Sequence, residues 1–321
     1  MKKFVAILLT LMLVLGVSAA FATEVPPTTA PTYTDQETVT IQKAYKLVGA
    51  GTSPAETFTL VQVGDGRVTD GEAAAAPALG TITGAAFAAG AATVNGATGD
   101  ITVALPTYTS VGKYEYTLKE VAGTTAGVDY YGNDIKLVVT VINDGEGKIR
   151  VAAVHTESEG GTKSDTFENT YSAGTLNVSK TVTGNLGDES KYFEFKVTLT
   201  GVTYGTSYAV TGGTNTANPN AIKIGEETTF LLKHGETIHI ANLPYGVSYT
   251  VTETAATGYT TSATGATGTI NAAEQLAAFT NNKTGEIDMG VTTENLPYVL
   301  LIGFVVLAGA ALLLKRKAHN N

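Results

Sequence analysis

The sequence predicts an all-β protein built from two tandem sandwich domains, and three observations lead to this fold class. Hydrophobic residues make up 43% of the 321 residues and charged residues only 15%, so the chain can bury sizeable cores. Thr, Val and Tyr are abundant, which is a composition that favours strands. Short apolar or alternating runs recur along the chain, and most are bounded by Gly, Asn, Asp or Pro.

The first 22 residues have the pattern of a secretory signal peptide. Two lysines precede a long apolar stretch, which ends in Ala20-Phe21-Ala22, a small-residue cleavage signature. We therefore expect residues 1–22 to be removed and the mature chain to begin at Thr23. Residues 23–36 are rich in Pro and Thr without apolar periodicity, which predicts an extended leader.

Two series of strands are expected next, separated by Ser172-Ala173-Gly174. They divide the body of the chain into domains 37–172 and 173–283. The alanine-rich stretch 71–92 contains too many glycines to predict a helix. The expected strands are 37–48, 56–63, 100–108, 113–121, 134–144 and 148–157 in the first domain, and 175–182, 192–201, 228–235, 236–243, 247–254 and 275–282 in the second.

The end of the sequence resembles a membrane anchor. Residues 296–314 carry no charge, and Lys315-Arg316-Lys317 follow directly. A stretch of this length predicts a transmembrane helix, with residues 315–321 as a basic cytoplasmic tail and 284–295 as a linker that precedes the helix. The body of the chain is thus expected to face outward from the cell.

Composition excludes several classes of function. The net charge is −9, and between Thr23 and Asn295 it is 15 − 29 = −14, which argues against binding to nucleic acid. The absence of cysteine excludes disulfides and thiolate metal sites. The four histidines have no metal-ligand spacing, and no cofactor or metal site is predicted.

The two halves repeat one order of residue types. Each has a lysine in its first strand, a Tyr-x-x-x-Glu pattern in a later strand, and Phe-x-Asn in its last strand. An apolar interior favours the neutral, nucleophilic form of a lysine, and a protonated Glu beside it can polarise an Asn carboxamide and carry protons. The expected product is an intramolecular Lys-Asn isopeptide bond, formed once and without turnover, so the protein is not expected to be an enzyme.

These residues resemble a known family. The segments KTVTGNLGDESKYFEFKVTLTG (180–201), SYTVTET (248–254) and AAFTNN (277–282) are similar to the isopeptide-containing shaft pilins of Gram-positive bacteria of the streptococcal type, and KYEYTLKEV (113–121) and DTFENTY (165–171) resemble the same family. The resemblance implies an immunoglobulin-like sandwich for each domain and assembly by a sortase. It also implies two triads of Lys, catalytic Glu and Asn, which are Lys43, Glu120 and Asn169 in the first domain and Lys180, Glu253 and Asn281 in the second.

Two positions in the triads have competitors. Lys46 competes with Lys43, because strand alternation gives each of them apolar neighbours on its own face. Asn282 competes with Asn281, although Asn282 lies on the opposite face from Phe279.

The residues that would link one subunit to the next are less well marked. The usual Leu-Pro-x-Thr-Gly sorting motif is absent. Spacing from Pro297-Tyr298, by comparison with the resembled family, favours Met289 as acyl donor, and Thr284 is its rival. The family resemblance also points to Lys163, in a Gly-rich stretch at the end of the first domain, as the acceptor, with Lys148 as its rival.

The sequence therefore predicts a structural subunit of a cell-surface pilus on a Gram-positive bacterium. Its expected partners are further copies of itself, a pilus-class sortase, minor pilins and, before processing, the membrane. An anchored adhesin that uses the same domains as a stalk is the alternative. A secreted carbohydrate-active enzyme would need paired carboxylates in a cleft, and no such pair stands out beyond the triads.

Overall fold

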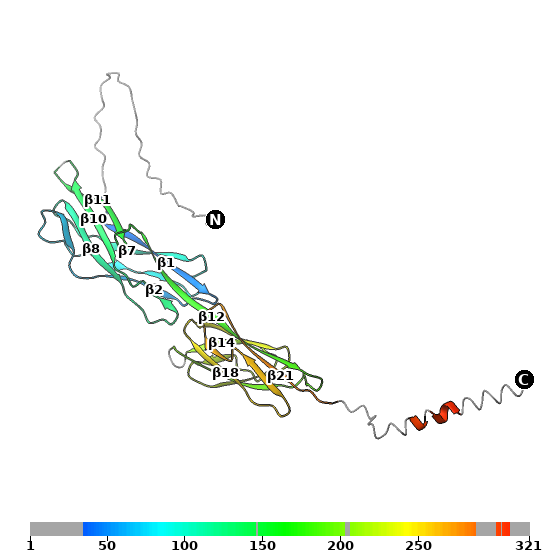
Figure 1. Cartoon of the computed structure of the whole chain (residues 1–321). Coiled ribbons are helices and arrows are strands. Elements are labelled where there is room, and N and C mark those ends of the chain that lie inside the picture. Colours follow the sequence, from blue (N-terminus) through cyan, green and yellow to red (C-terminus); the bar gives the residue numbers. More distant parts are fainter. Residues whose placement is uncertain (1–34, 146, 203–205, 287–299, 303, 309–321) are drawn as a thin grey trace, which may run out of the picture. The chain divides into compact units, whose positions relative to one another are not determined.

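The computed structural model describes residues 35–145, 147–202, 206–286, 300–302 and 304–308, which Figure 1 draws mainly as strands. The all-β prediction is confirmed, and the stretch 71–92 contains two short strands rather than a helix. Helical residues occur only at 300–302 and 304–308 of the described chain. Within these described ranges, no helix combines the length and apolar character needed to cross a membrane. The expected signal peptide lies outside them.

The first hydrophobic core lies between two sheets. One sheet has the order β5-β7-β1-β12, and the other has the order β11-β10-β8-β3, with β4 also paired to β8. The strands around this core are β1 (Thr38–Gly49), β2 (Glu56–Phe58), β3 (Leu60–Gln62), β4 (Arg67–Gly71), β5 (Ile82–Thr83), β6 (Ala85–Phe87), β7 (Ala97–Ala104), β8 (Gly112–Glu120), β9 (Val128–Asp129), β10 (Ile135–Asn143), β11 (Ile149–Glu157) and the first half of β12 (Thr166–Thr183).

The second core repeats this plan. The second half of β12 lies between β17 and β21, and a separate sheet has the order β16-β13-β18-β20. The strands after β12 are β13 (Phe193–Thr200), β14 (Ser207–Gly212), β15 (Ala221–Lys223), β16 (Thr228–Leu232), β17 (Thr237–Pro244), β18 (Ser248–Glu253), β19 (Thr260–Thr264), β20 (Thr267–Thr269) and β21 (Glu274–Asn282).

Strand β12, labelled in Figure 1, contributes buried residues to both cores. The sequence predicts one strand that bears Asn169 and a separate strand over 175–182, because Ser172-Ala173-Gly174 between them has the composition of a boundary. In the structure the strand is continuous, but its buried face changes side at this point. Alternate residues from Phe167 to Ala173 are buried, and the alternation then resumes one residue out of phase at Gly174. The shift coincides with an irregularity in the pairing with β17 between Gly174 and Leu176.

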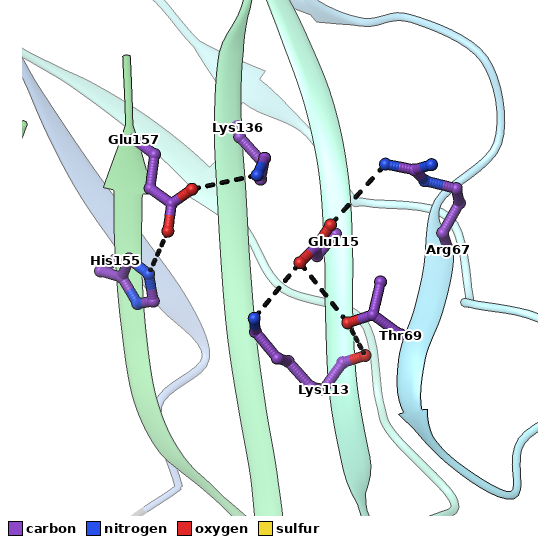
Figure 2. Close-up of polar contacts among 7 residues, drawn as sticks. All are labelled: Arg67, Thr69, Lys113, Glu115, Lys136, His155 and Glu157. Atoms are coloured by element: carbon purple, nitrogen blue, oxygen red, sulfur yellow. Dashed lines mark hydrogen bonds and ion pairs between the residues drawn. The ribbon is translucent and has the colours of Figure 1, made fainter. Parts of the chain in front are cut away.

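The outer face of the β11-β10-β8 sheet carries two separate groups of charged side chains, drawn in Figure 2. Glu157 on β11 lies 3.0 Å from Lys136 and 3.1 Å from His155. Glu115 on β8 lies 3.3 Å from Lys113 and 3.7 Å from Arg67. Because Lys136, Lys113 and Arg67 are exposed, solvent screens these pairs and each contributes little to stability.

Candidate intramolecular cross-link sites

The lysine and asparagine of each predicted triad lie on neighbouring parallel strands. In the first core Lys43 on β1 is opposite Phe167 on β12, and Asn169 is two residues further along. In the second core Lys180 on β12 is opposite Phe279 on β21, and Asn281 is again two residues further along. Residues two apart share a face of the sheet, so both pairs project into their cores with the same offset.

The glutamate of each triad comes from a strand of a different sheet. Glu120 is the last residue of β8 and pairs with Leu60, whereas Glu253 is the last residue of β18 and pairs with Phe195. Each core therefore receives Lys and Asn from one side and Glu from the other. A sandwich is the architecture that allows this, because the inner faces of its two sheets are opposed.

In the first core the three side chains form a closed set of contacts. The Lys43 ammonium donates to Glu120 Oε2 and, at 2.6 Å, to Asn169 Oδ1. The Asn169 amide nitrogen donates to Glu120 Oε1 at 2.5 Å. The backbone N–H of Tyr131 also donates to Asn169 Oδ1, at 2.8 Å. The amine, the carboxamide and the carboxyl group are thus in mutual contact, which is the geometry that general acid-base chemistry between them would require.

The second core has the same arrangement with one difference. The Lys180 ammonium lies 2.7 Å from Glu253 Oε2, and the Asn281 amide nitrogen donates to Glu253 Oε1. Asn281 Oδ1 is buried and, among the described residues, accepts no hydrogen bond. The carbonyl that would be attacked therefore lacks the contacts that its counterpart in the first core has.

Burial shifts the two lysines toward their neutral form. Lys43 and Lys180 are each 1% exposed. Desolvation lowers the pKa of both amines below the ordinary lysine value, and the hydrogen bond and charge of the adjacent glutamate only partly oppose this. Phe58 lies 5.4 Å from Lys43 Nζ, and Phe193 lies 4.2 Å from Lys180 Nζ, measured to the ring centroids. A neutral amine is the form that can attack a carboxamide.

The competing residues lie elsewhere. Lys46 is half-buried and pairs with Thr170, whereas Asn282 is exposed at the end of β21. The structure therefore brings together Lys43 with Asn169 and Lys180 with Asn281, rather than their competitors.

The predicted linkage residues are only partly described. Lys163 is exposed and follows a hydrogen-bonded turn between β11 and β12, in which Ser158 N–H donates to Thr162 O. Lys148 is exposed as well. Thr284 is exposed beside Gly285, whose N–H donates to Asn185. Met289 lies outside the described residues.

Two features of the site cannot be found by scanning for Lys, Glu and Asn. The Tyr131 contact uses a backbone amide from the segment between β9 and β10, so no side-chain pattern marks it. The rings next to the lysines do leave a signal, because Phe58 and Phe193 both stand in early strands that mix Glu with aromatic residues.

Comparison with known proteins agrees with this geometry. Residues 39–172 match the family of the Spy0128-like isopeptide containing domain, and residues 174–283 match a domain of unknown function. A pilin of Streptococcus pyogenes serotype M1 is 31% identical over 236 residues, which are 66% of this chain and 69% of that protein. The pilus tip adhesin Cpa of Streptococcus pyogenes is 33% identical over 127 residues, which are 37% of this chain and 18% of the adhesin.

A solved structure shows the same relationship. The crystal structure of the major pilin from Streptococcus pyogenes superposes with a TM-score of 0.50 at 26% identity, over 78% of this chain and 100% of that one. The similarity thus extends over both cores, and the identity to the curated pilin covers more than two thirds of that protein. The chain therefore belongs to the streptococcal shaft pilin family and is a structural subunit of a pilus.

Proposed function

We propose that this subunit cross-links itself through two autocatalytic isopeptide bonds, Lys43 to Asn169 and Lys180 to Asn281. The observation that carries the proposal is the repeated burial of Lys, Glu and Asn in contact within each core. In each reaction the lysine Nζ attacks Cγ of the asparagine, the Cγ–Nδ2 bond breaks, and ammonia leaves. Glu120 or Glu253 accepts a proton from Nζ and delivers it to Nδ2, so the carboxyl is regenerated. Each site reacts once, and the protein is not an enzyme.

Each bond lies within one of two immunoglobulin-like domains, which we place at residues 37–172 and 173–283. The separate hydrophobic cores support this division, because the first ends at Ala173 and the second begins at Leu176. Each bond closes nearly a whole domain, since it joins a domain's first strand to its last. A chain without cysteine thereby gains a covalent constraint that does not depend on redox conditions.

Export and covalent assembly complete the proposal. The signal peptide 1–22 directs export to the surface of a Gram-positive cell, and the uncharged segment 296–314, acting as a transmembrane anchor with the basic tail 315–321, holds the subunit in the membrane until a pilus-class sortase acts. The sortase joins Met289 of one copy, or alternatively Thr284, to Lys163 of the next, and minor pilins join the same fibre. Exposure of the Lys163 side chain supports its assignment as the acceptor.

Intact-mass measurement of the folded recombinant chain tests the two bonds. Each bond removes one ammonia, so the mass should fall below that of the sequence by two ammonia molecules. Glu253→Ala should restore one of them, because the proton carrier of the second site is lost. Lys46→Ala and Asn282→Ala are matched controls that should retain both losses. A folded wild-type chain with the full sequence mass would contradict the proposal for both domains.

Polymer assembly on cells tests the linkage. Lys163→Arg keeps the positive charge but replaces the amine that accepts the acyl group, so high-mass ladders on denaturing gels should disappear. Lys148→Arg, at the rival exposed position, should leave the ladders intact. Intact ladders from the Lys163→Arg strain would refute this acceptor without affecting the proposal for the internal bonds.

A further inference from the structure

The two triads differ at the carbonyl oxygen that receives negative charge during the reaction. When Nζ adds to Cγ of the asparagine, the side-chain oxygen becomes an oxyanion of a tetrahedral intermediate. In the first core this oxygen, Asn169 Oδ1, accepts from Lys43 Nζ at 2.6 Å and from Tyr131 N–H at 2.8 Å. Once Nζ is bonded to Cγ it no longer serves as an external donor, so the backbone amide of Tyr131 is the donor that remains.

The fold holds this amide in place before the reaction begins. Strand β9 pairs with β12 directly beside the reactive asparagine, with Asp129 opposite Thr170. The chain then leaves the sheet, and the Tyr131 ring packs edge-on against Phe167 with its centroid 5.1 Å away. The same ring lies 5.6 Å from Lys43 Nζ. A donor fixed in this way needs no reorganisation when charge develops, which is the condition for strong electrostatic stabilisation.

The second core offers no equivalent donor among the residues that the structure describes. Asn281 Oδ1 is buried there without a hydrogen-bond partner. Strand β21 lies between β12 and β19, and both pairings include the asparagine, with Val182 opposite Asn281 on one side and Thr261 opposite it on the other. Backbone amides of a paired strand lie in the plane of the sheet and are directed at the neighbouring strand, not at a side chain that points into the core.

We propose that the Tyr131 backbone amide is the oxyanion donor of the first site, that the second site lacks one, and that the Lys43-Asn169 bond therefore forms faster than the Lys180-Asn281 bond. This inference rests on the isopeptide chemistry proposed above. Loss of a single oxyanion donor slows acyl-transfer reactions by roughly 10²–10³-fold. The first domain would then be closed covalently while the second is still held by noncovalent packing alone.

The order of bond formation is measured on the wild-type chain. Protein recovered unfolded and unreacted in denaturant is refolded by dilution, and samples are quenched over time for intact mass. Proteolysis of each sample assigns the lost ammonia to the peptide pair containing Asn169 or to that containing Asn281. We expect the first-domain pair to appear well before the second. Equal rates, or a faster second domain, would overturn the inference.

A substitution then tests the amide directly. Tyr131→Pro removes the N–H and should slow the first bond by about 10²-fold. Tyr131→Phe keeps the N–H and the ring and is the matched control, expected to react at the wild-type rate. An unchanged rate in a Tyr131→Pro chain with wild-type circular dichroism would overturn the assignment. If that variant fails to fold, the order in which the two bonds form in the wild-type chain decides whether the inference holds. Complete absence of ammonia loss from both domains would instead refute the isopeptide proposal itself.

Discussion

Replacing Lys180 by Met tests how much the second bond contributes to the free energy of unfolding. The side chain is 1% exposed and lies against Phe193 and Phe195, so a flexible apolar residue of similar length can occupy the same space. The substitution removes the nucleophile without opening a large cavity, as an alanine would. Its effect on stability is then dominated by the loss of the covalent constraint.

The magnitude follows from the length of chain that the bond closes. Lys180 and Asn281 are 281 − 180 = 101 residues apart. By analogy with disulfides, cross-linking a loop of this length destabilises the unfolded state by about 4.7 kcal/mol. Glu253 also loses the partner of its Oε2 atom, which costs about 1–3 kcal/mol when the group stays buried. The free energy of unfolding of the second domain should fall by roughly 6–8 kcal/mol, the sum of these two effects.

Calorimetry and limited proteolysis measure this loss. The melting temperature of the second domain should drop by at least about 20 °C, and protease should cleave it while the first domain persists. Lys196→Met is the control and should change little, because Lys196 is a surface lysine whose ion pair with the exposed Glu227 is screened by solvent. If Lys180→Met melted within a few degrees of a wild type that has lost two ammonia molecules, the loop-closure reasoning would be wrong.

Three further substitutions have defined outcomes. In Asn281→Ala the Lys180 amine stays buried and unlinked, and its pKa in the folded chain is lowered. Between that lowered pKa and 10.5 the unfolded chain binds more protons than the folded chain, so the free energy of unfolding measured in urea should rise with pH across this window. The wild type should lack this rise, because its Lys180 is an amide in the proposed bond. Glu115→Gln, in one of the two charged groups of Figure 2, should change the free energy of unfolding by less than about 1 kcal/mol. A larger loss in urea titration would contradict the view that solvent screens these pairs. At Gly174 a β carbon would lie 2.1 Å from Ala272 O, so Gly174→Ala should lower the melting temperature. Gly132→Ala is the control and should not lower it, because no atom lies within 4 Å of a β carbon built at Gly132. Equal melting curves for the two variants would contradict this prediction.

Alternation within single strands predicts many of the elements, whereas the residues of both triads follow from the repeated order of Lys, Glu and Asn and from the family resemblance. Tyr114, Tyr116 and Leu118 alternate clearly in the sequence, and all three are buried on β8. Alternation could not choose between Lys43 and Lys46, because that choice depends on which face of β1 meets the core. This depends in turn on the parallel pairing with β12, whose residues are more than 120 positions away.

One strand that the sequence does not predict, β19, lacks an apolar signal of its own. All residues of β19 are exposed, so its strand character comes from pairing with β21 rather than from burial. The continuity of β12 is not predicted, because the small residues around Gly174 are typical of a domain boundary in sequence, whereas here they allow close approach to Ala272. Side-chain patterns carry no information about a backbone donor such as Tyr131 N–H.

The shared strand β12 also governs how far the subunit can stretch. Asn169 and Lys180 stand on this one strand, eleven residues apart, and no separate linker intervenes. A strand at about 3.3 Å per residue is already nearly fully extended, so this stretch of about 36 Å holds almost no slack. If both proposed bonds form, a pull between them meets an inextensible segment. Any extension of the fibre under tension would then occur at the junctions between successive subunits.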